Sequence, residues 1–236
     1  MLDNINPENI LFLDIETVPE HPEFKNAPDN FRKLWEKKAE RLRRADEETA
    51  ESLYQRAGIY AEFGKIICIS VGFLNKNELR IKSFAGDNEK EVLSDFADLL
   101  NNHYTKPHHN LCAHNGREFD FPYIARRFLI NQIKLPKILD ISGRKPWEVS
   151  FIDTMELWKF GDFKNYTSLE LLAAVFNIPS PKDDIAGSDV CNVYWMEKDL
   201  PRIVKYCQKD VITIVQLYRC FRGEPLLPEQ NVSYVD

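Results

Sequence analysis

The stretch "NILFLDIETVPE", residues 9–20, is an apolar run that ends in two acids one residue apart, Asp14 and Glu16. The run predicts a buried strand over residues 10–17, because strands buried on both faces read as near-continuous apolar segments. Side chains alternate between the faces of a strand, so Asp14 and Glu16 should point the same way. Two buried carboxylates raise each other's pKa unless a counter-charge relieves them. The pair therefore suggests a divalent cation, although acids at strand ends also occur as ordinary surface residues.

The pattern beyond this strand predicts a layered α/β or α+β fold. Further strands are expected over 65–74 and 77–86, joined as a hairpin by the polar "NKN", and then over 110–115 and "VSFIDTMEL", 149–157. Helices are expected over 89–103, 119–130, 168–178 and 200–221, with Ser168 and Asp199 as caps of the last two. Because the strands begin as a hairpin and then alternate with helices, a mixed sheet is favoured.

Residues 29–57 do not fit this alternation. Apolar residues recur there at helical spacing among charged ones, which predicts one long helix or a helical hairpin, inserted at about 20–60. The segment carries "KKAERLRR", residues 37–44. This basic run is either a solvated helix face or an arm that touches a phosphate backbone.

Length and composition favour a folded chain with a substantial core. The 236 residues, 44% of them hydrophobic, are expected to form a single domain over 1–236. No apolar run is long enough to span a bilayer, and the polar N-terminus does not resemble a signal peptide. The five cysteines are scattered and form no C-x-x-C pair, which favours reduced thiols over zinc ligands. A cytoplasmic protein without a membrane partner is therefore expected.

The formal net charge of -6 argues against a general nucleic-acid binder, which usually has a basic excess. The objection weakens if several of the acids hold divalent cations, because bound cations offset their charge. A phosphodiester substrate is therefore compatible with the composition.

Two further segments carry acids at meaningful positions. "HNGREFDFPYI", 114–124, places Asp120 in the first turn of an expected helix, where the helix dipole tolerates negative charge. "YCQKDV", 206–211, places Tyr206 and Asp210 on one face of the last helix, because residues four apart are neighbours there. Each acid alone also has a structural explanation, as a helix N-terminal residue or as part of a salt bridge.

Taken together and in this order, the three segments resemble the three motifs of the DEDDy 3′-5′ exonucleases. The matching residues are "DIET", "NGREFDFPY" and "YCQKD", and within that superfamily the chain is most similar to the exonuclease domains of family B DNA polymerases and their stand-alone relatives. The segment 168–190 also resembles the helix and loop before the third motif. The sister group with His at position 205 is disfavoured, because Lys stands there and Tyr follows. The resemblance covers roughly 9–221 and leaves the insertion unexplained.

The resemblance implies a ribonuclease H-like fold, with a mixed sheet of about five strands flanked by helices and a helical insertion after the first strand. It implies a metal-dependent 3′-5′ exonuclease that uses two divalent cations, Mg²⁺ or Mn²⁺, and releases nucleoside 5′-monophosphates from single-stranded nucleic acid with a free 3′ end, DNA favoured over RNA. Carried over to this chain, Asp14 would bridge both cations, Glu16 and Asp210 would complete one site, and Asp120 would support the other. Tyr206 would orient the attacking water.

Other positions are weaker candidates for substrate binding. Thr17 and Val18 follow the first motif and could meet the terminal nucleotide, and Lys182 could touch a phosphate. Asn115 and Phe119 belong to the second motif, and such positions contact or pack near the terminal nucleotide in relatives, although core packing is the favoured explanation for Phe119.

Two strand-end residues, His114 and Asp153, are expected to be structural rather than catalytic. The alternative to an exonuclease is a non-catalytic nucleic-acid-binding or adaptor module on the same fold, because a fold does not determine a function. A hydrolase of sugar or nucleotide phosphates is a third possibility.

Overall fold

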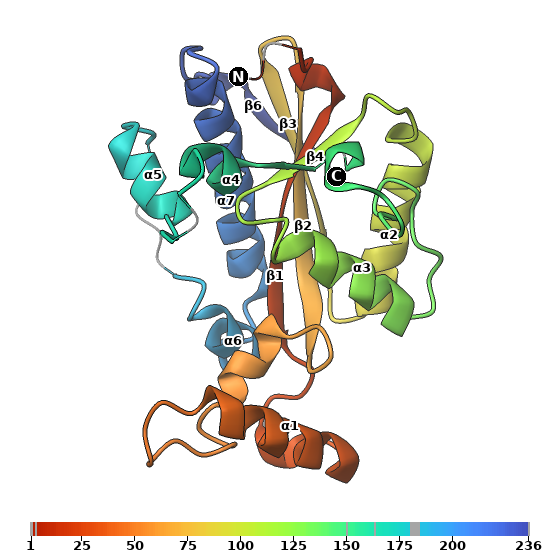
Figure 1. The fold of residues 1–236 in the computed structure, drawn as a ribbon, viewed down its shortest axis with the longest axis vertical. Helices are drawn as coiled ribbons and strands as arrows, with labels where there is room; N and C mark the ends of the chain where they lie inside the picture. Colours follow the sequence, from red (N-terminus) through yellow and green to blue (C-terminus); the bar gives the residue numbers. More distant parts are fainter. Residues whose placement is uncertain (1, 3, 150, 163, 180–184, 236) are drawn as a thin grey trace.

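The structure is a computed structural model that describes residues 2, 4–149, 151–162, 164–179 and 185–235 (Figure 1). Within these residues, six strands form one sheet in the order β5-β4-β1-β2-β3-β6. The strands are β1 Ile10–Pro19, β2 Gly64–Asn75, β3 Glu78–Ala85, β4 Asn110–Ala113, β5 Phe151–Asp153 and β6 Val232–Val235. The expected mixed sheet is confirmed, since β1 pairs antiparallel with β2 and parallel with β4. The short β6 adds a sixth strand that was not predicted.

Helices cover both faces of the sheet. They are α1 Asp29–Leu42, α2 Glu89–His103, α3 Asp120–Ile130, α4 Thr154–Lys159, α5 Leu169–Val175, α6 Val190–Asn192 and α7 Leu200–Phe221, and a π-helical turn, Val193–Glu197, follows α6. Figure 1 shows α2 and α3 on one side of β1, and α4 to α7 on the other. The predicted caps are confirmed, because Ser168 accepts a hydrogen bond from the Leu171 amide and Asp199 accepts one from the Arg202 amide. No helix in the described part of the chain is long and apolar enough to cross a membrane.

Alternation along β1 determines what each of its faces meets. Leu11, Leu13 and Ile15 pack into a cluster with residues of α2 and α3. Ile10 and Phe12 face the other way and pack against α7. The side chains that continue this second face are therefore directed towards the α7 side of the sheet.

The expected strand over 149–157 is wrong beyond Asp153. The carboxylate of Asp153 accepts hydrogen bonds from the amides of Met155, at 2.9 Å, and Glu156, at 3.3 Å. This is an N-cap, so the chain enters α4 directly after three strand residues.

The insertion between β1 and β2 is present but differs from both predicted forms. It contains the helix α1 and a six-residue 3₁₀ segment, Tyr54–Ile59, instead of one long helix or a pair of α-helices. Trp35 is buried between them, and its indole N–H donates to the Ala50 carbonyl at 2.7 Å. The insertion thus has a small core of its own, and it lies beyond the end of β1 (Figure 1).

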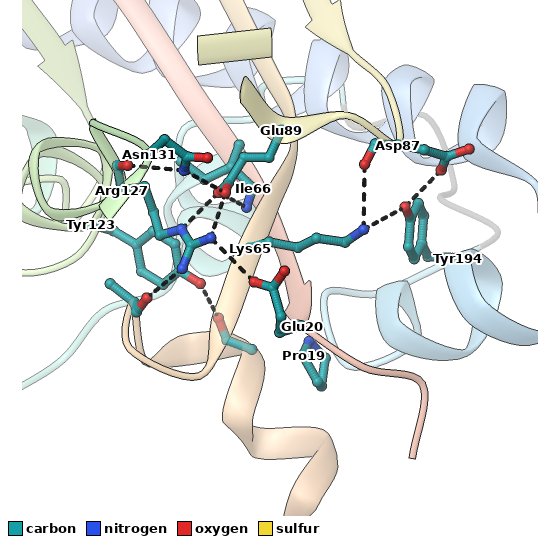
Figure 2. Close-up of polar contacts among 12 residues, drawn as sticks. Pro19, Glu20, Lys65, Ile66, Asp87, Glu89, Tyr123, Arg127, Asn131 and Tyr194 are labelled. Atoms are coloured by element: carbon teal, nitrogen blue, oxygen red, sulfur yellow. Dashed lines mark hydrogen bonds and ion pairs between the residues drawn. The ribbon is translucent and has the colours of Figure 1, made fainter. Parts of the chain in front are cut away.

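A buried arginine joins the insertion to the rest of the fold (Figure 2). Arg127 on α3 donates to the Ala61 carbonyl at 2.9 Å and to Glu89 on α2 at 2.8 Å. Its second ion pair is with Glu20, just beyond β1, at 3.2 Å. Glu89 in turn accepts a hydrogen bond from the Ile66 amide of β2 at 2.7 Å. One guanidinium therefore links α2, α3, the end of β1 and the insertion.

Candidate active site

The central strand presents Asp14 and Glu16 on the face that α7 covers. Asp14 lies opposite Ser70, and Glu16 lies opposite Cys68, on β2. The register shifts between Glu16 and Thr17, so a β-bulge directly follows the second acid. Such bulges bend the strand and redirect side chains, and they are common beside active sites. The extra residue is Ile67 on β2, and the pairing of β1 with β2 resumes beyond it from Thr17 to Pro19.

Helix α7 brings its own polar residues against these acids. Ile203 and Val211 are fully buried, as predicted for its inward face. Cys207 lies four residues from each, and its Sγ is 3.4 Å from both the main-chain oxygen and a carboxylate oxygen of Asp14. The potential ligand atoms of Asp14, Glu16 and Cys207 lie within 4.8 Å of one another.

Asp120 reaches the same place from the other helix layer. It is the first residue of α3, it is only 3% exposed, and its carboxylate forms a hydrogen bond with the backbone amide of Ile15. The predicted turn before it is confirmed, because Asn115 adopts a left-handed φ of 60°. At Gly116 a Cβ would lie 2.5 Å from the Cβ of Ala113, so this tight turn requires glycine.

The electrostatics show that the four acids form one cluster. Burial raises the pKa of Asp14 well above its ordinary value, and the charges of Asp210, Glu16 and Asp120 raise it further. Burial also raises the pKa of Glu16 well above its ordinary value, and the charge of Asp210 raises it further. Burial raises the pKa of Asp120 to about 7, with the charges of Asp153 and Asp210 adding to the effect. Oxygen donors crowded in this way are the kind of set that hard divalent cations prefer.

Tyr206 lies beside the cluster with its hydroxyl protonated. Burial raises the pKa of Tyr206 above its usual range, followed by the charges of Asp210, Glu16 and Asp14 and a side-chain hydrogen bond with Asp210. A Cβ built on Gly187 would lie 3.8 Å from the Tyr206 hydroxyl, so the chain that leads to α6 passes close by. The tyrosine is therefore a hydrogen-bond donor among carboxylates.

The expected substrate-binding residues differ in their burial. Thr17 is half-buried and forms a hydrogen bond with Tyr123, and Phe119 is half-buried with its ring 5.5 Å from that of Tyr123. The side chain of Val18 is fully buried in an apolar cluster, and its contact with a nucleotide stays a prediction. Lys182 lies outside the described residues.

The side chain of Asn115 lies at the turn before α3 and leaves one polar atom unpaired among the described residues. Its Oδ1 atom is buried and has no hydrogen-bond partner within the described residues. Its backbone amide donates to the Asp153 carboxylate at 2.9 Å, which confirms a structural role for Asp153. The side-chain oxygen thus keeps an unused acceptor next to Gly116 and the first turn of α3.

Sequence reasoning missed Cys207 as a member of the site. Its place between Ile203 and Val211 on the inward face of α7 was the available signal.

A pocket between the insertion, α2 and α3 is separate from the acidic cluster. Its lining residues, which include Phe31, Lys65 and Arg127, contain none of the four clustered acids.

Comparison with known proteins identifies the fold and the family. A family model described as "Predicted 3'-5' exonuclease related to the exonuclease domain of PolB" matches residues 59–224. The matched range contains Asp120, Tyr206 and Asp210 and begins after β1. The family B DNA polymerase from Pyrobaculum calidifontis aligns with a TM-score of 0.57 and 16% identity over 90% of this chain, which spans 24% of the polymerase chain. This likeness shows a ribonuclease H-like fold.

Two other solved structures align more loosely. An "ExoI/SSB-Ct complex" has a TM-score of 0.40 and 12% identity, over 84% of this chain and 42% of that one. The RNase domain of the yeast Pop2 protein has a TM-score of 0.39 and 13% identity, over 88% of this chain and 78% of that one.

Proposed function

Because the chain belongs to the family of 3′-5′ exonucleases related to the exonuclease domain of PolB, we propose that it is a metal-dependent 3′-5′ exonuclease. It acts on single-stranded nucleic acid with a free 3′ end, DNA favoured over RNA, and releases nucleoside 5′-monophosphates. The observation that carries the proposal is the single cluster of Asp14, Glu16, Asp120 and Asp210 beside Tyr206. The relation to PolB is what favours DNA. Residues 1–236 act as one exonuclease domain, and the free cysteines favour a cytoplasmic location.

The donor set fits two divalent cations, Mg²⁺ or Mn²⁺. Asp14, Glu16 and Asp210 would hold one cation, with Asp14 also reaching the second, which Asp120 would support. Burial and mutual repulsion raise the pKa of these carboxyl groups, so bound cations would relieve an existing electrostatic cost. When bound, such cations lower the pKa of the attacking water and stabilise the leaving 3′ oxygen.

The residues of the chain itself position the reactants. Tyr206 stays neutral beside Asp210 and can direct its hydroxyl to the attacking water. The Cys207 thiol holds the Asp14 carboxylate, and the Ile15 amide holds the Asp120 carboxylate. Carboxylates fixed by such contacts keep their geometry before the substrate arrives.

Contacts with the terminal nucleotide are proposed at the mouth of this cluster. Asn115 offers an unpaired side-chain oxygen, and Phe119 offers a half-buried ring beside Asp120. Thr17 directly follows the register shift after Glu16, and its side chain is half-buried.

The proposal is tested by digestion of a 5′-labelled oligonucleotide with Mg²⁺ or Mn²⁺ and with EDTA. A metal-dependent ladder should appear, and Asp14→Asn or Asp210→Asn should slow it on the order of 100-fold or more, since the cations supply several kcal/mol of stabilisation. Asp98→Asn, an exposed acid on α2, is the control and should digest normally. Matched DNA and RNA strands then test the substrate preference.

Two outcomes of the digestion assay would contradict the exonuclease proposal. An oligonucleotide that binds but is never cut, with either cation, would replace the exonuclease with a nucleic-acid-binding module on the same fold. Cleavage of small phosphate esters alone would indicate a phosphate hydrolase instead.

A further inference from the structure

His114 fixes a distant segment of chain beside the acidic cluster. Its Nε2 lies 2.9 Å from the Thr167 carbonyl oxygen, and its Nδ1 lies 2.9 Å from the Thr154 hydroxyl. A carbonyl only accepts, so Nε2 carries the proton and Nδ1 accepts from the hydroxyl. Burial lowers the pKa of His114, which agrees with a neutral ring. Both nitrogens are occupied, and the histidine acts as a link between the end of β4 and Thr167.

The link determines where Tyr166 lies. Thr167 is tied to the residue that precedes Asn115, and the next residue, Ser168, caps α5 through the Leu171 amide at 3.2 Å. The backbone that carries Tyr166 is therefore anchored directly after it by two hydrogen bonds. The backbone from which the Tyr166 ring projects is therefore held beside the end of β4.

Tyr166 exposes its ring on the segment that His114 ties to the end of β4. The residue is 67% exposed, although tyrosine usually covers most of its ring. Partial burial raises the pKa of Tyr166, and the negative charges of Asp120, Asp153 and Glu118 raise it further. Negative charge on this side disfavours a phosphate against the ring and favours a neutral, flat ligand.

We propose that Tyr166 is a stacking platform for an unpaired base of the substrate strand, next to the nucleotide that is removed. The proposal rests on the proposed function and extends it to the choice of single strands. Every base has an aromatic face, so stacking tolerates any sequence, whereas bases in a duplex must first be unstacked. One exposed tyrosine would thus favour single-stranded ends without reading their sequence.

The test compares an oligonucleotide, which has a base next to the terminal nucleotide, with a nucleotide ester that has only one base. Tyr166→Ala should raise KM for a single-stranded oligonucleotide about 5- to 100-fold, the range of stacking on one aromatic side chain. Cleavage of the p-nitrophenyl ester of thymidine 5′-monophosphate, which has one base only, should stay within about twofold because no stacking partner is lost. Tyr166→Phe keeps the ring and should behave as the wild type.

The matched control is Tyr234→Ala. Tyr234 is 60% exposed on β6, at the edge of the sheet opposite to β5 and β4. An abasic nucleotide at the second position from the 3′ end should also abolish the difference between wild type and Tyr166→Ala. This substitution removes the base instead of the ring, so it tests the same contact from the other side.

The proposal is overturned if Tyr166→Ala matches Tyr234→Ala on the oligonucleotide, if it impairs the nitrophenyl ester equally, or if Tyr166→Phe is as defective as Tyr166→Ala. Failure of the proposed function is distinguishable, because the wild type itself would then cut neither substrate. In that case, fluorescence anisotropy of a labelled oligonucleotide with Ca²⁺ decides. Weaker binding by Tyr166→Ala alone supports the platform, and equal binding by all variants overturns it.

Discussion

Asp14 and Glu16 lose hydration when α7 packs over β1, and the loss raises the pKa of each carboxyl group. The alternation of β1 places both on one face, and the register with β2 shifts directly after Glu16. Cys207 adds a thiol contact to Asp14 from the same helix that carries Tyr206. The site is thus a set of buried and half-buried acids that contacts from neighbouring residues orient.

Tyr206→Phe tests whether the hydroxyl takes part in the reaction. The ring and its packing remain, so we expect KM to change little and kcat to fall on the order of 100-fold, as for loss of a group that positions a proton-transfer partner. Steady-state kinetics on the labelled oligonucleotide provide both constants. Tyr234→Phe is the control, and a Tyr206→Phe enzyme with unchanged kcat would exclude the proposed role.

Elements far apart in the chain are tied together by few buried polar groups. Arg127 and Glu89 are both almost fully buried and pair with each other, between α3 and α2. Arg127 also holds the Ala61 carbonyl, at the end of the insertion, and Glu20 after β1. The insertion therefore depends on the core for its orientation, in addition to its own apolar cluster around Trp35.

Arg127→Met should destabilise the protein by about 3–5 kcal/mol, because it leaves Glu89 buried without its counter-charge. Urea unfolding followed by circular dichroism measures this change. Arg126→Met, an exposed neighbour on the same helix, should change stability by less than about 0.5 kcal/mol.

The double variant Arg127→Met with Glu89→Gln removes the stranded charge and should recover part of the loss. Equal effects of Arg127→Met and Arg126→Met would contradict the structural role assigned to the buried pair.

Folding brings acids from β1, α3 and α7 together, and their burial and mutual repulsion lower the free energy of unfolding of the whole molecule when the acids are ionised. For Asp120, burial raises the pKa from its ordinary value of 3.8 to about 7. Between these values the folded chain keeps a proton that the unfolded chain has lost. The contribution of Asp120 to the free energy of unfolding without cations should therefore fall as pH rises from about 4 to about 7.

Divalent cations should reverse this loss, since they bind the ionised carboxylates. Thermal unfolding in EDTA and in Mg²⁺ should show a larger gain from the cation at about pH 8 than at about pH 5. Asp120→Asn should flatten part of the profile in EDTA, while Asp98→Asn should leave it unchanged. A cation effect of equal size at both pH values would contradict the linkage.

Much of the fold was predictable because local patterns report which face of an element is buried. The apolar run before Asp14, the periodicity of α2 and α7, and the caps at Ser168 and Asp199 were all confirmed. The resemblance to the PolB-related exonucleases, which rested on three short motifs, is confirmed by the family match. The extent of β5 was not predictable from apolar content, because the Asp153 side chain ends the strand through hydrogen bonds.

Local spacing was enough to predict the strands β1 to β5, the helices α2, α3, α5 and α7, and the residue types that a cation site needs, but it did not predict α4, α6 or β6. Which of these residues meet depends on the packing between elements. The Ile15 amide bonds to Asp120, the Cys207 thiol bonds to Asp14, and His114 holds the chain next to Tyr166. These contacts join residues far apart in the chain, and periodicity carries information on the buried face but none on the partner across it. The contacts that surround "DIET", residues 14–17, are therefore known only from the packing of the folded chain.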